Sequence, residues 1–171
     1  MRWTKAAGIA IVFVLSLLSV SVHAEDKPQE TSAQDDSVRF AAYVAAGDKA
    51  RQQTRYAEAF AAYTKALEIR SEASVEGRLG LVMFATGAYA PAAEYLLRAI
   101  TRAKAPPDLM REFHEAFAHV RPKVCFVEIF VSQQGADILV DGQMEPESEI
   151  NAFHIFVTAG THTFQAKLKG F

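Results

Sequence analysis

Apolar side chains recur at helical spacing through the first half of the chain. In the segment 38–53 they are Phe40, Tyr43, Val44 and Ala50, and the segment 56–69 repeats this pattern. Residues three or four positions apart share one face of an α-helix, so each segment predicts an amphipathic helix. The two predicted helices meet near residues 54 and 55.

A stretch of the second predicted helix occurs twice. YAEAFAAYTKAL at residues 56–67 recurs as YAPAAEYLLRAI at residues 89–100, and aligned positions are 33 residues apart. Gly47 and Gly80 stand in the same register. A fixed period of this length indicates stacked helical hairpins, because one hairpin is too small to bury its own apolar face.

Gly47 lies inside the first predicted helix, where glycine costs about 1 kcal/mol relative to alanine. We expect this cost to be offset by close packing against Ala59 or Ala62 of the next helix. A fifth helix is predicted from Asp108, as its N-cap, to about Val120, because two prolines precede it and one apolar stripe runs along it.

After Pro122 the period of the apolar pattern falls from 3.6 to 2, which indicates a domain boundary near residues 121–123. Strands are predicted at 123–132, 137–140, 152–158 and 161–169. In the last of these His162 and Phe164 begin an apolar face, so we expect a half-buried strand. Asp141-Gly142 predicts a type I′ hairpin, whose central residues need positive φ. The chain is therefore expected to be an α+β protein.

The helical half resembles the tetratricopeptide repeat family. The matching residues of the first copy are Tyr43, Ala46-Gly47, Ala50, Tyr56, Ala59, Tyr63 and Ala66-Leu67. Those of the second copy are Leu79-Gly80, Met83, Tyr89, Ala92, Leu96 and Ala99-Ile100. Ser71 and Glu76 depart from the family pattern. The resemblance implies that residues 38–121 form all-α helix pairs whose inner helices line a concave surface.

By the same resemblance, that concave surface would bind a protein through Val44, Asp48, Arg51, Leu81 and Phe84. An alternative for Leu81 and Phe84 is that they only fill the interface between helices, because apolar residues at helical spacing usually belong to a core.

The second half is similar to the bacterial PEGA domain, through GADILVDG and FVTAGTHTFQAKLKGF. This implies that residues 122–171 form a small antiparallel β-sandwich. The acidic loop at residues 144–149 departs from the family pattern. The family usually continues beyond the Gly-aromatic pair that stands here at Phe171, so we expect either an incomplete domain, the favoured alternative, or a sheet completed by a partner chain.

The N-terminus is typical of an exported protein. Arg2 and Lys5 precede an uncharged apolar stretch that ends at Val22-His23-Ala24, which predicts a secretory signal peptide over residues 1–24. An uncleaved membrane anchor is the alternative. Residues 25–37 carry five acidic side chains, one lysine and no large apolar residue, so we expect a flexible acidic linker. A periplasmic or secreted protein of the cell envelope is thus predicted.

Composition argues against several classes of function. The chain has 171 residues, half of them apolar, and a net charge of −2, so nothing indicates a nucleic-acid partner. It contains no glycine-rich phosphate loop and no G-x-S-x-G elbow, so no catalytic or cofactor-binding residue is predicted and we expect no enzyme. Cys125 is the only cysteine and lies among β-formers, where a buried, inert thiol is expected.

No metal site is predicted either. His114 and His119 are five residues apart, which turns them about 140° from each other on a helix. Asp137 and Asp141 share a strand face, but Asp141 is already explained by turn chemistry.

Two functions from different classes remain open. The first is a non-enzymatic envelope adaptor that binds a protein or peptide through its helical repeats while its β-domain contacts the envelope. The second is a module that binds carbohydrate or peptidoglycan through exposed aromatic side chains of the β-domain.

Overall fold

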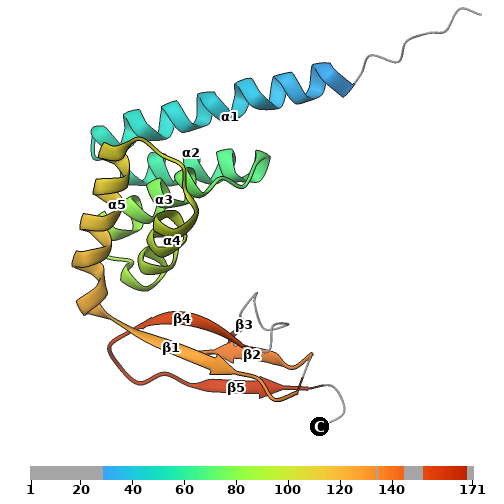
Figure 1. Ribbon diagram of the computed structural model, residues 1–171, viewed down its shortest axis with the longest axis vertical. Helices are drawn as coiled ribbons and strands as arrows, with labels where there is room; N and C mark the ends of the chain where they lie inside the picture. Colours follow the sequence, from blue (N-terminus) through green and yellow to red (C-terminus); the bar gives the residue numbers. More distant parts are fainter. Residues whose placement is uncertain (1–28, 134, 145–151, 169–171) are drawn as a thin grey trace, which may run out of the picture.

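The structure, a computed structural model, describes residues 29–133, 135–144 and 152–168 (Figure 1). The predicted signal peptide of residues 1–24, most of the predicted acidic loop and the end of the last predicted strand lie outside these residues.

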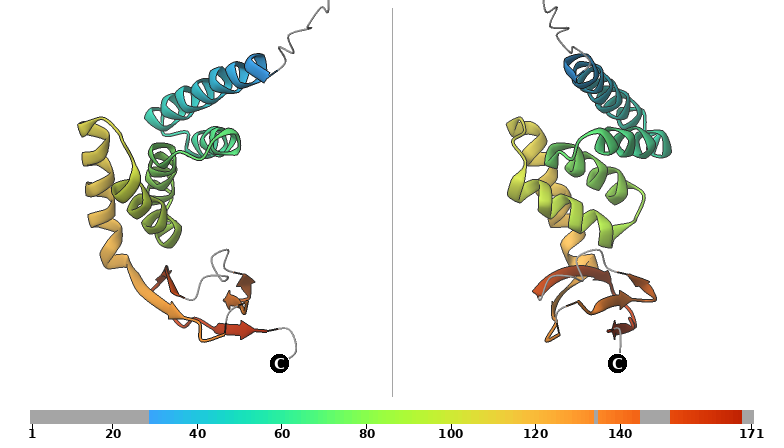
Figure 2. Two further views of the ribbon diagram at one scale, coloured as in Figure 1. Left: turned by 45° about the vertical axis from the view of Figure 1, so that its right-hand side comes forward. Right: turned by 90° about the vertical axis from the view of Figure 1, so that its right-hand side faces the viewer.

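The described residues form an α+β fold, as predicted, with five α-helices followed by two small antiparallel sheets (Figures 1 and 2). The helices are α1 (Gln29–Gln52), α2 (Tyr56–Ile69), α3 (Ala73–Ala85), α4 (Tyr89–Arg102) and α5 (Pro107–Val120). A short 3-10 turn (Arg121–Lys123) leads from α5 into the first strand at the predicted domain boundary.

The repeat of 33 residues corresponds to two helical hairpins, α1–α2 and α3–α4. The second helix of each begins at an equivalent tyrosine, Tyr56 in α2 and Tyr89 in α4. Equivalent positions are fully buried in both hairpins: Ala59 and Ala92, Tyr63 and Leu96, Ala66 and Ala99. The period of 33 residues therefore corresponds to equivalent helices with equivalent buried positions.

The two equivalent glycines lie at close contacts between the two helices of each hairpin. A Cβ atom on Gly47 would lie 2.4 Å from the ring of Tyr63, and one on Gly80 would lie 3.0 Å from Cγ of Leu96. Close packing at Gly47 is thus confirmed, although the nearest atoms belong to the Tyr63 ring rather than to the alanines that we expected.

The predicted linker is wrong for residues 29–37, because α1 already begins at Gln29. Residues 33–37 are exposed, and this end of α1 extends beyond α2 (Figure 1). Once the packed part of α1 is helical, each further residue adds one backbone hydrogen bond, so the absence of large apolar residues did not exclude a helix here. Asp108 is likewise not an N-cap: α5 begins at Pro107, and Asp108 lies in its first turn beside Arg111 at 2.8 Å.

Two sheets of antiparallel strands follow the helices. One pairs β1 (Val124–Phe130) with β4 (Ala152–Thr158), and the other has the order β3 (Gln143–Met144), β2 (Asp137–Val140), β5 (Phe164–Lys167). The sheets share a core of Ile138, Val140, Phe153 and Ile155. Asp141 has φ 52° and Gly142 has φ 81°, which confirms the predicted turn between β2 and β3.

Two burial predictions in this half are wrong. Cys125 is exposed, and β5 is exposed on both faces instead of half-buried. Phe164 pairs with Val140 in register, yet it remains 45% exposed while Val140 is buried. The opposing sheet has only two strands in the described residues, so it is too narrow to cover the whole inner face of the β3-β2-β5 sheet.

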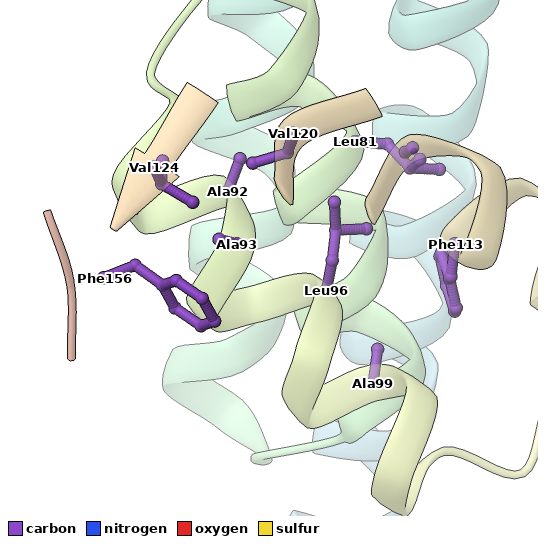
Figure 3. Packing of buried hydrophobic residues seen from close by; sticks show 10 residues of the cluster. Leu81, Ala92, Ala93, Leu96, Ala99, Phe113, Val120, Val124 and Phe156 are labelled. Atoms are coloured by element: carbon purple, nitrogen blue, oxygen red, sulfur yellow. The ribbon is translucent and has the colours of Figure 1, made fainter. Parts of the chain in front are cut away.

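The strands and helices share a hydrophobic core. Phe156 of β4 and Val124 of β1 are buried with Leu96, Phe113 and Val120 of α4 and α5 (Figure 3). The ring of Phe156 also meets that of Phe117 edge to face, with their centroids 6.1 Å apart. This core fixes β4 directly beneath α4.

Candidate functional site

The five residues of the predicted concave surface divide between two cavities. Arg51, Leu81 and Phe84 line a cavity between α1, α3 and α5, whereas Val44 and Asp48 line another beside the start of α3. The first has a volume of about 330 Å³, and we call it the inner groove. Its remaining lining residues are Tyr56, Ala85, Glu112, Glu115, Ala116 and His119.

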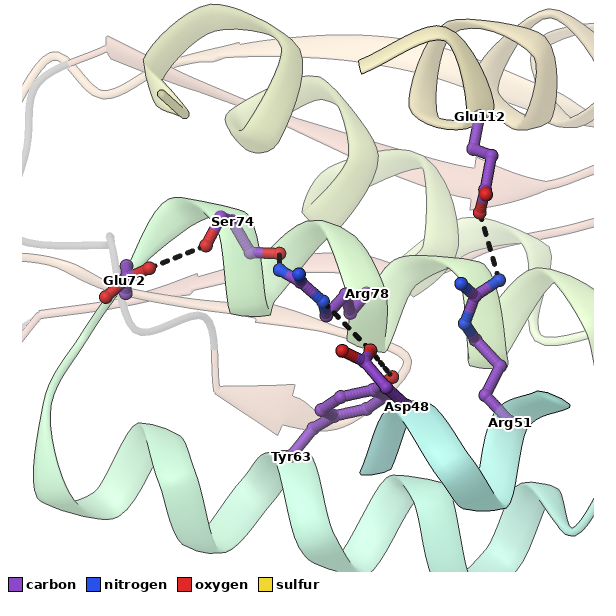
Figure 4. A network of polar contacts seen from close by, with 7 residues as sticks. All are labelled: Asp48, Arg51, Tyr63, Glu72, Ser74, Arg78 and Glu112. Carbon is purple, nitrogen blue, oxygen red and sulfur yellow. Dashed lines mark hydrogen bonds and ion pairs between the residues drawn. The ribbon is translucent and has the colours of Figure 1, made fainter. Parts of the chain in front are cut away.

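Asp48 is part of a polar network that joins the two hairpins (Figure 4). It accepts a hydrogen bond from the Tyr63 hydroxyl at 2.7 Å and one from Nε of Arg78 at 3.0 Å. Arg78 also donates to the carbonyl of Ser74 at 3.1 Å. The carboxylate of Asp48 therefore forms hydrogen bonds within the protein, to Tyr63 of α2 and Arg78 of α3.

Tyr63 is the donor of this network at all ordinary pH values. Its side chain is fully buried, and burial raises its pKa far above the usual value. Its hydrogen bond to the Asp48 carboxylate raises the pKa further, because ionisation would place two negative charges together. The protonated phenol is thus a structural link between α1 and α2.

Arg51 lines the inner groove beside α5. Its Nη1 donates to Oε2 of Glu112 on α5 at 3.0 Å (Figure 4). Its Nε is buried and has no hydrogen-bond partner within the described part of the chain. Arg51 and Glu112 consequently place a polar bridge at one wall of the groove.

Most of the apolar lining of the groove comes from α3. Phe84 stacks on His119 of α5, with ring centroids 6.3 Å apart and planes at 8°. Leu81 is buried in the helical core, which matches the alternative that it fills a helix interface. Three of the five predicted residues, Arg51, Leu81 and Phe84, thus line one cavity together with residues of α5, and Leu81 and Phe84 also pack in the helical core.

Sequence reasoning missed the contribution of α5. Glu112, Glu115 and His119 lie on the fifth predicted helix, and the sequence assigned none of them to the binding surface. Their spacing of three and four residues, beside the apolar stripe of Phe113, was the available signal that they share a polar stripe.

A third cavity, of about 510 Å³, lies between α4 and the strands, and we call it the edge groove. It is lined by Ala90, Pro91, Glu94 and Arg98 of α4, by residues 153–158 of β4, by Val140, Asp141 and Gln143 of the hairpin, and by His162. The oxygen Oε1 of Glu94 accepts a hydrogen bond from the backbone N–H of Phe156 at 2.8 Å.

His162 fastens the hairpin at the other end of the edge groove. Its Nδ1 lies 2.6 Å from Oδ2 of Asp141, and its Nε2 lies 2.7 Å from the carbonyl oxygen of Thr158. The hydrogen bond to Asp141, and then that to Thr158, raises the pKa of His162. The same hydrogen bond with His162, followed by the backbone N–H of Thr163, lowers the pKa of Asp141.

The pair of His162 and Asp141, which we call the clasp, joins the turn after β2 to the segment before β5. Both ring nitrogens of His162 are engaged, one by a carboxylate and one by a backbone carbonyl, so neither is available to take a proton from a substrate. Asp141 was predicted only as a turn residue, and its second role depends on β5 lying beside β2. No group of three metal-ligating side chains occurs among the residues that the structure describes.

No family model, curated protein or solved structure matches the chain. Within the described ranges, no helix is long and apolar enough to cross a membrane.

Proposed function

We propose that the protein is a non-enzymatic adaptor that holds a segment of a partner protein in the inner groove. The observation that carries this proposal is the convergence of Arg51 and Phe84, from two inner helices, with the polar stripe of α5 around one cavity. Open grooves of this kind suit a peptide segment, because an apolar anchor and a few placed charges fix it without any reacting group. In this proposal the protein is exported. Its helix pairs act as tetratricopeptide-like repeats, and its PEGA-like strands contact the cell envelope.

The lining of the inner groove defines the chemistry of the partner segment. Phe84 and His119 provide an aromatic surface for an apolar side chain. Two carboxylates, Glu112 and Glu115, line the cavity. Glu112 is paired with Arg51, which also lines it, whereas Oε1 of Glu115 lies 3.9 Å from Nε of Arg111, which does not. The carboxylates therefore outnumber the guanidinium groups that line the cavity. The preferred segment therefore combines an apolar residue with lysine or arginine.

Selection from a displayed library of random peptides tests this proposal with the purified protein. Peptides retained by the protein should share an apolar residue beside a basic one, and they should lose at least about tenfold in affinity on Phe84→Ala. Phe60→Ala is the matched control, because Phe60 is an exposed phenylalanine on α2 outside the inner groove. Equal losses in the two variants, or no shared sequence, would contradict the proposal.

A second candidate function, glycan binding by the strands, has its own observation. Phe126 and Phe130 occupy the same face of β1 and are 41% and 78% exposed. Exposed aromatic rings in a row are rarely left on a surface without a partner, and sugar rings stack on such faces. If this candidate holds, the protein should sediment with purified peptidoglycan, and replacing both phenylalanines by serine should abolish that retention, whereas Phe164→Ser should not.

A further inference from the structure

We propose that the inner groove continues into the cavity beside the start of α3, and that the partner segment places an aspartate or glutamate there. We call this cavity, of about 480 Å³, the basic cavity. The acidic residue would stand about four positions from the apolar and basic pair that the inner groove holds. This inference rests on the proposed function, because it names a further feature of the same partner segment.

One face of α1 lines both cavities. Five of the lining residues are spaced by four and three positions in turn, so they follow one another along a single stripe of the helix. The first four line the basic cavity and the last lines the inner groove: Ser37, Ala41, Val44, Asp48 and Arg51. The two cavities therefore open along the same side of α1.

The same arrangement occurs on α3. Ser74 and Arg78 line the basic cavity, and Leu81 and Ala85 line the inner groove. Their intervals of four, three and four positions again place them on one face of the helix. Arg78 and Leu81, at the adjoining ends of the two cavities, are separated by only about 4.5 Å along the helix axis.

The loop before α5 and α5 itself form a third wall in the same order. Residues 104–106 of the loop line the basic cavity, and four residues of α5 between positions 112 and 119 line the inner groove. Along each wall the basic cavity thus comes first in the sequence. The polar contacts of Figure 4 follow this succession, from Glu72 and Ser74, through Arg78 and Asp48, to Arg51 and Glu112. The two cavities therefore belong to one surface that a single segment can follow.

The charged groups of the basic cavity leave one positive charge uncompensated. Its lining holds three cations and two carboxylates: Arg70, Arg78, Lys104, Asp48 and Glu72. Arg78 is paired with Asp48 at 3.0 Å, and Arg70 with Glu72 at 2.9 Å. Lys104 is exposed and forms no ion pair within the part of the chain that the structure describes. The basic cavity is therefore complementary to a group with one negative charge, such as a carboxylate.

The protein's own carboxylates are bound in place by hydroxyl groups as well. Ser74 donates to Glu72 at 2.7 Å, and Tyr63 donates to Asp48 at 2.7 Å. The hydrogen bond from Ser74 lowers the pKa of Glu72, so this carboxylate stays ionised and remains a partner of Arg70. An incoming cation would have to compete with these contacts, which favours an anion as the ligand of the cavity.

Arg70 is held where an incoming carboxylate can reach it. Its guanidinium carbon lies 4.0 Å from the centroid of the buried Phe40 ring. Stacking of this kind leaves the N–H groups at the edge of the guanidinium plane free to donate, and Glu72 occupies only one side of that edge. A carboxylate in the basic cavity can thus pair with Lys104 and also accept a hydrogen bond from Arg70.

The distance between the two cavities sets the spacing within the partner segment. On α1 and α3 their lining residues are centred about seven to nine positions apart, which corresponds to about 11 to 13 Å. An extended segment advances about 3.3 Å per residue, and its side chains alternate between two sides. Four positions, or about 13 Å, is the even spacing closest to this distance, so the acidic residue and the apolar anchor point into the surface together.

Four capped peptides test the site with the full chain. Each has about nine residues, mostly serine, with leucine and then lysine as the pair for the inner groove. One carries glutamate four positions before the leucine, a second carries glutamine there, and the other two are the same sequences reversed, so that both chain directions are covered. In calorimetry we expect one glutamate peptide to bind at least about fivefold more tightly than its glutamine counterpart, and this preference should shrink as salt is added.

A charge reversal tests the role of Lys104. In Lys104→Glu the preference for glutamate over glutamine should disappear. Lys49→Glu is the matched control, because Lys49 is an exposed lysine of α1 that lines neither cavity, and it should keep the preference. Both positions are exposed, so neither change is expected to disturb the fold. Persistence of the preference in Lys104→Glu, or its equal loss in Lys49→Glu, would overturn the assignment.

The glutamine peptides separate this inference from the proposed function. If glutamate and glutamine peptides bind equally and both weaken in Phe84→Ala, the acidic position is overturned while the inner groove remains supported. Absence of binding by every peptide at about 1 mM would contradict both. A phosphoserine peptide that binds at least about tenfold more tightly than the glutamate peptide would overturn the carboxylate and assign the basic cavity to a phosphorylated segment.

Discussion

Arg51 of α1 and Glu112 of α5 form an ion pair of 3.0 Å across 61 residues of sequence. The pair joins the first helix of the array to the last, and it lines the inner groove that both residues help to form. A partner that places a basic side chain in this groove would compete with Arg51 for Glu112. The same contact thus contributes to the fold and to the selection of a ligand.

The first prediction concerns the energy of this ion pair. In a double-mutant cycle of Arg51→Ala and Glu112→Ala, we expect a coupling energy of about 0.5 kcal/mol, because both side chains remain partly exposed and solvent screens their attraction. Urea unfolding of the four proteins measures it, and the coupling should decrease as salt is added. A coupling that does not respond to salt would contradict an electrostatic origin.

The second prediction compares the two equivalent glycines. Gly47→Ala should lower the free energy of unfolding by about 2 kcal/mol, because the new methyl group would overlap the fully buried ring of Tyr63. Gly80→Ala should cost less, because its Cβ would lie 3.0 Å from Cγ of Leu96 and 3.1 Å from the Leu96 nitrogen and from Cβ of Tyr95, and the helical propensity of alanine offsets part of that strain. Denaturant unfolding checks both, and a greater loss for Gly80→Ala would contradict the packing described at Gly47.

These glycines also show how far the sequence predicts the structure. The repeat placed Gly47 and Gly80 at equivalent helix contacts, and the change of period located the strands. Both results follow from local spacing. The pairs Arg51–Glu112 and Glu94–Phe156 join residues 61 and 62 positions apart, and no local pattern specifies how two hairpins or a helix and a strand are placed in space.

The errors have a related physical cause. Alternation along a strand predicts that it has two faces, but the number of neighbouring strands decides which face is covered. Cys125 and Phe164 are therefore exposed although each lies in an apolar strand pattern. Asp48 was assigned to a binding surface because it lies on an inner helix, whereas its hydrogen bond to Tyr63 depends on how α1 and α2 are paired.

The third prediction concerns the network of Asp48. Tyr63→Phe keeps the buried ring but removes the hydroxyl that donates to Asp48, so we expect a loss of about 1 to 2 kcal/mol in the free energy of unfolding. Asp48 retains its ion pair with Arg78, which limits the loss. Tyr43→Phe is a suitable control, since Tyr43 is only partly buried on α1. Equal effects of the two substitutions in thermal unfolding would contradict a specific role for the Tyr63 hydroxyl.

The fourth prediction is a pH dependence at the clasp of His162 and Asp141. The pKa of His162 is raised above 6.5, so its contribution to stability is fully present below pH 6.5 and is lost as the pH rises through the raised pKa. The pKa of Asp141 is lowered below 3.8, so its contribution is present above pH 3.8 and is lost as the pH falls through the lowered pKa. The clasp should therefore stabilise the hairpin most in the interval between pH 3.8 and pH 6.5.

A titration of the His162 ring protons by nuclear magnetic resonance measures this effect directly. Asp141→Asn is the decisive variant, because asparagine tolerates the positive φ of 52° at this turn position while it removes the charge. The pKa of His162 should fall in this variant, although the carbonyl of Thr158 still favours the protonated ring. An unchanged pKa of His162 in this variant would mean that Asp141 does not stabilise the protonated imidazole ring. The pH dependence of unfolding would then have to come from elsewhere in the protein.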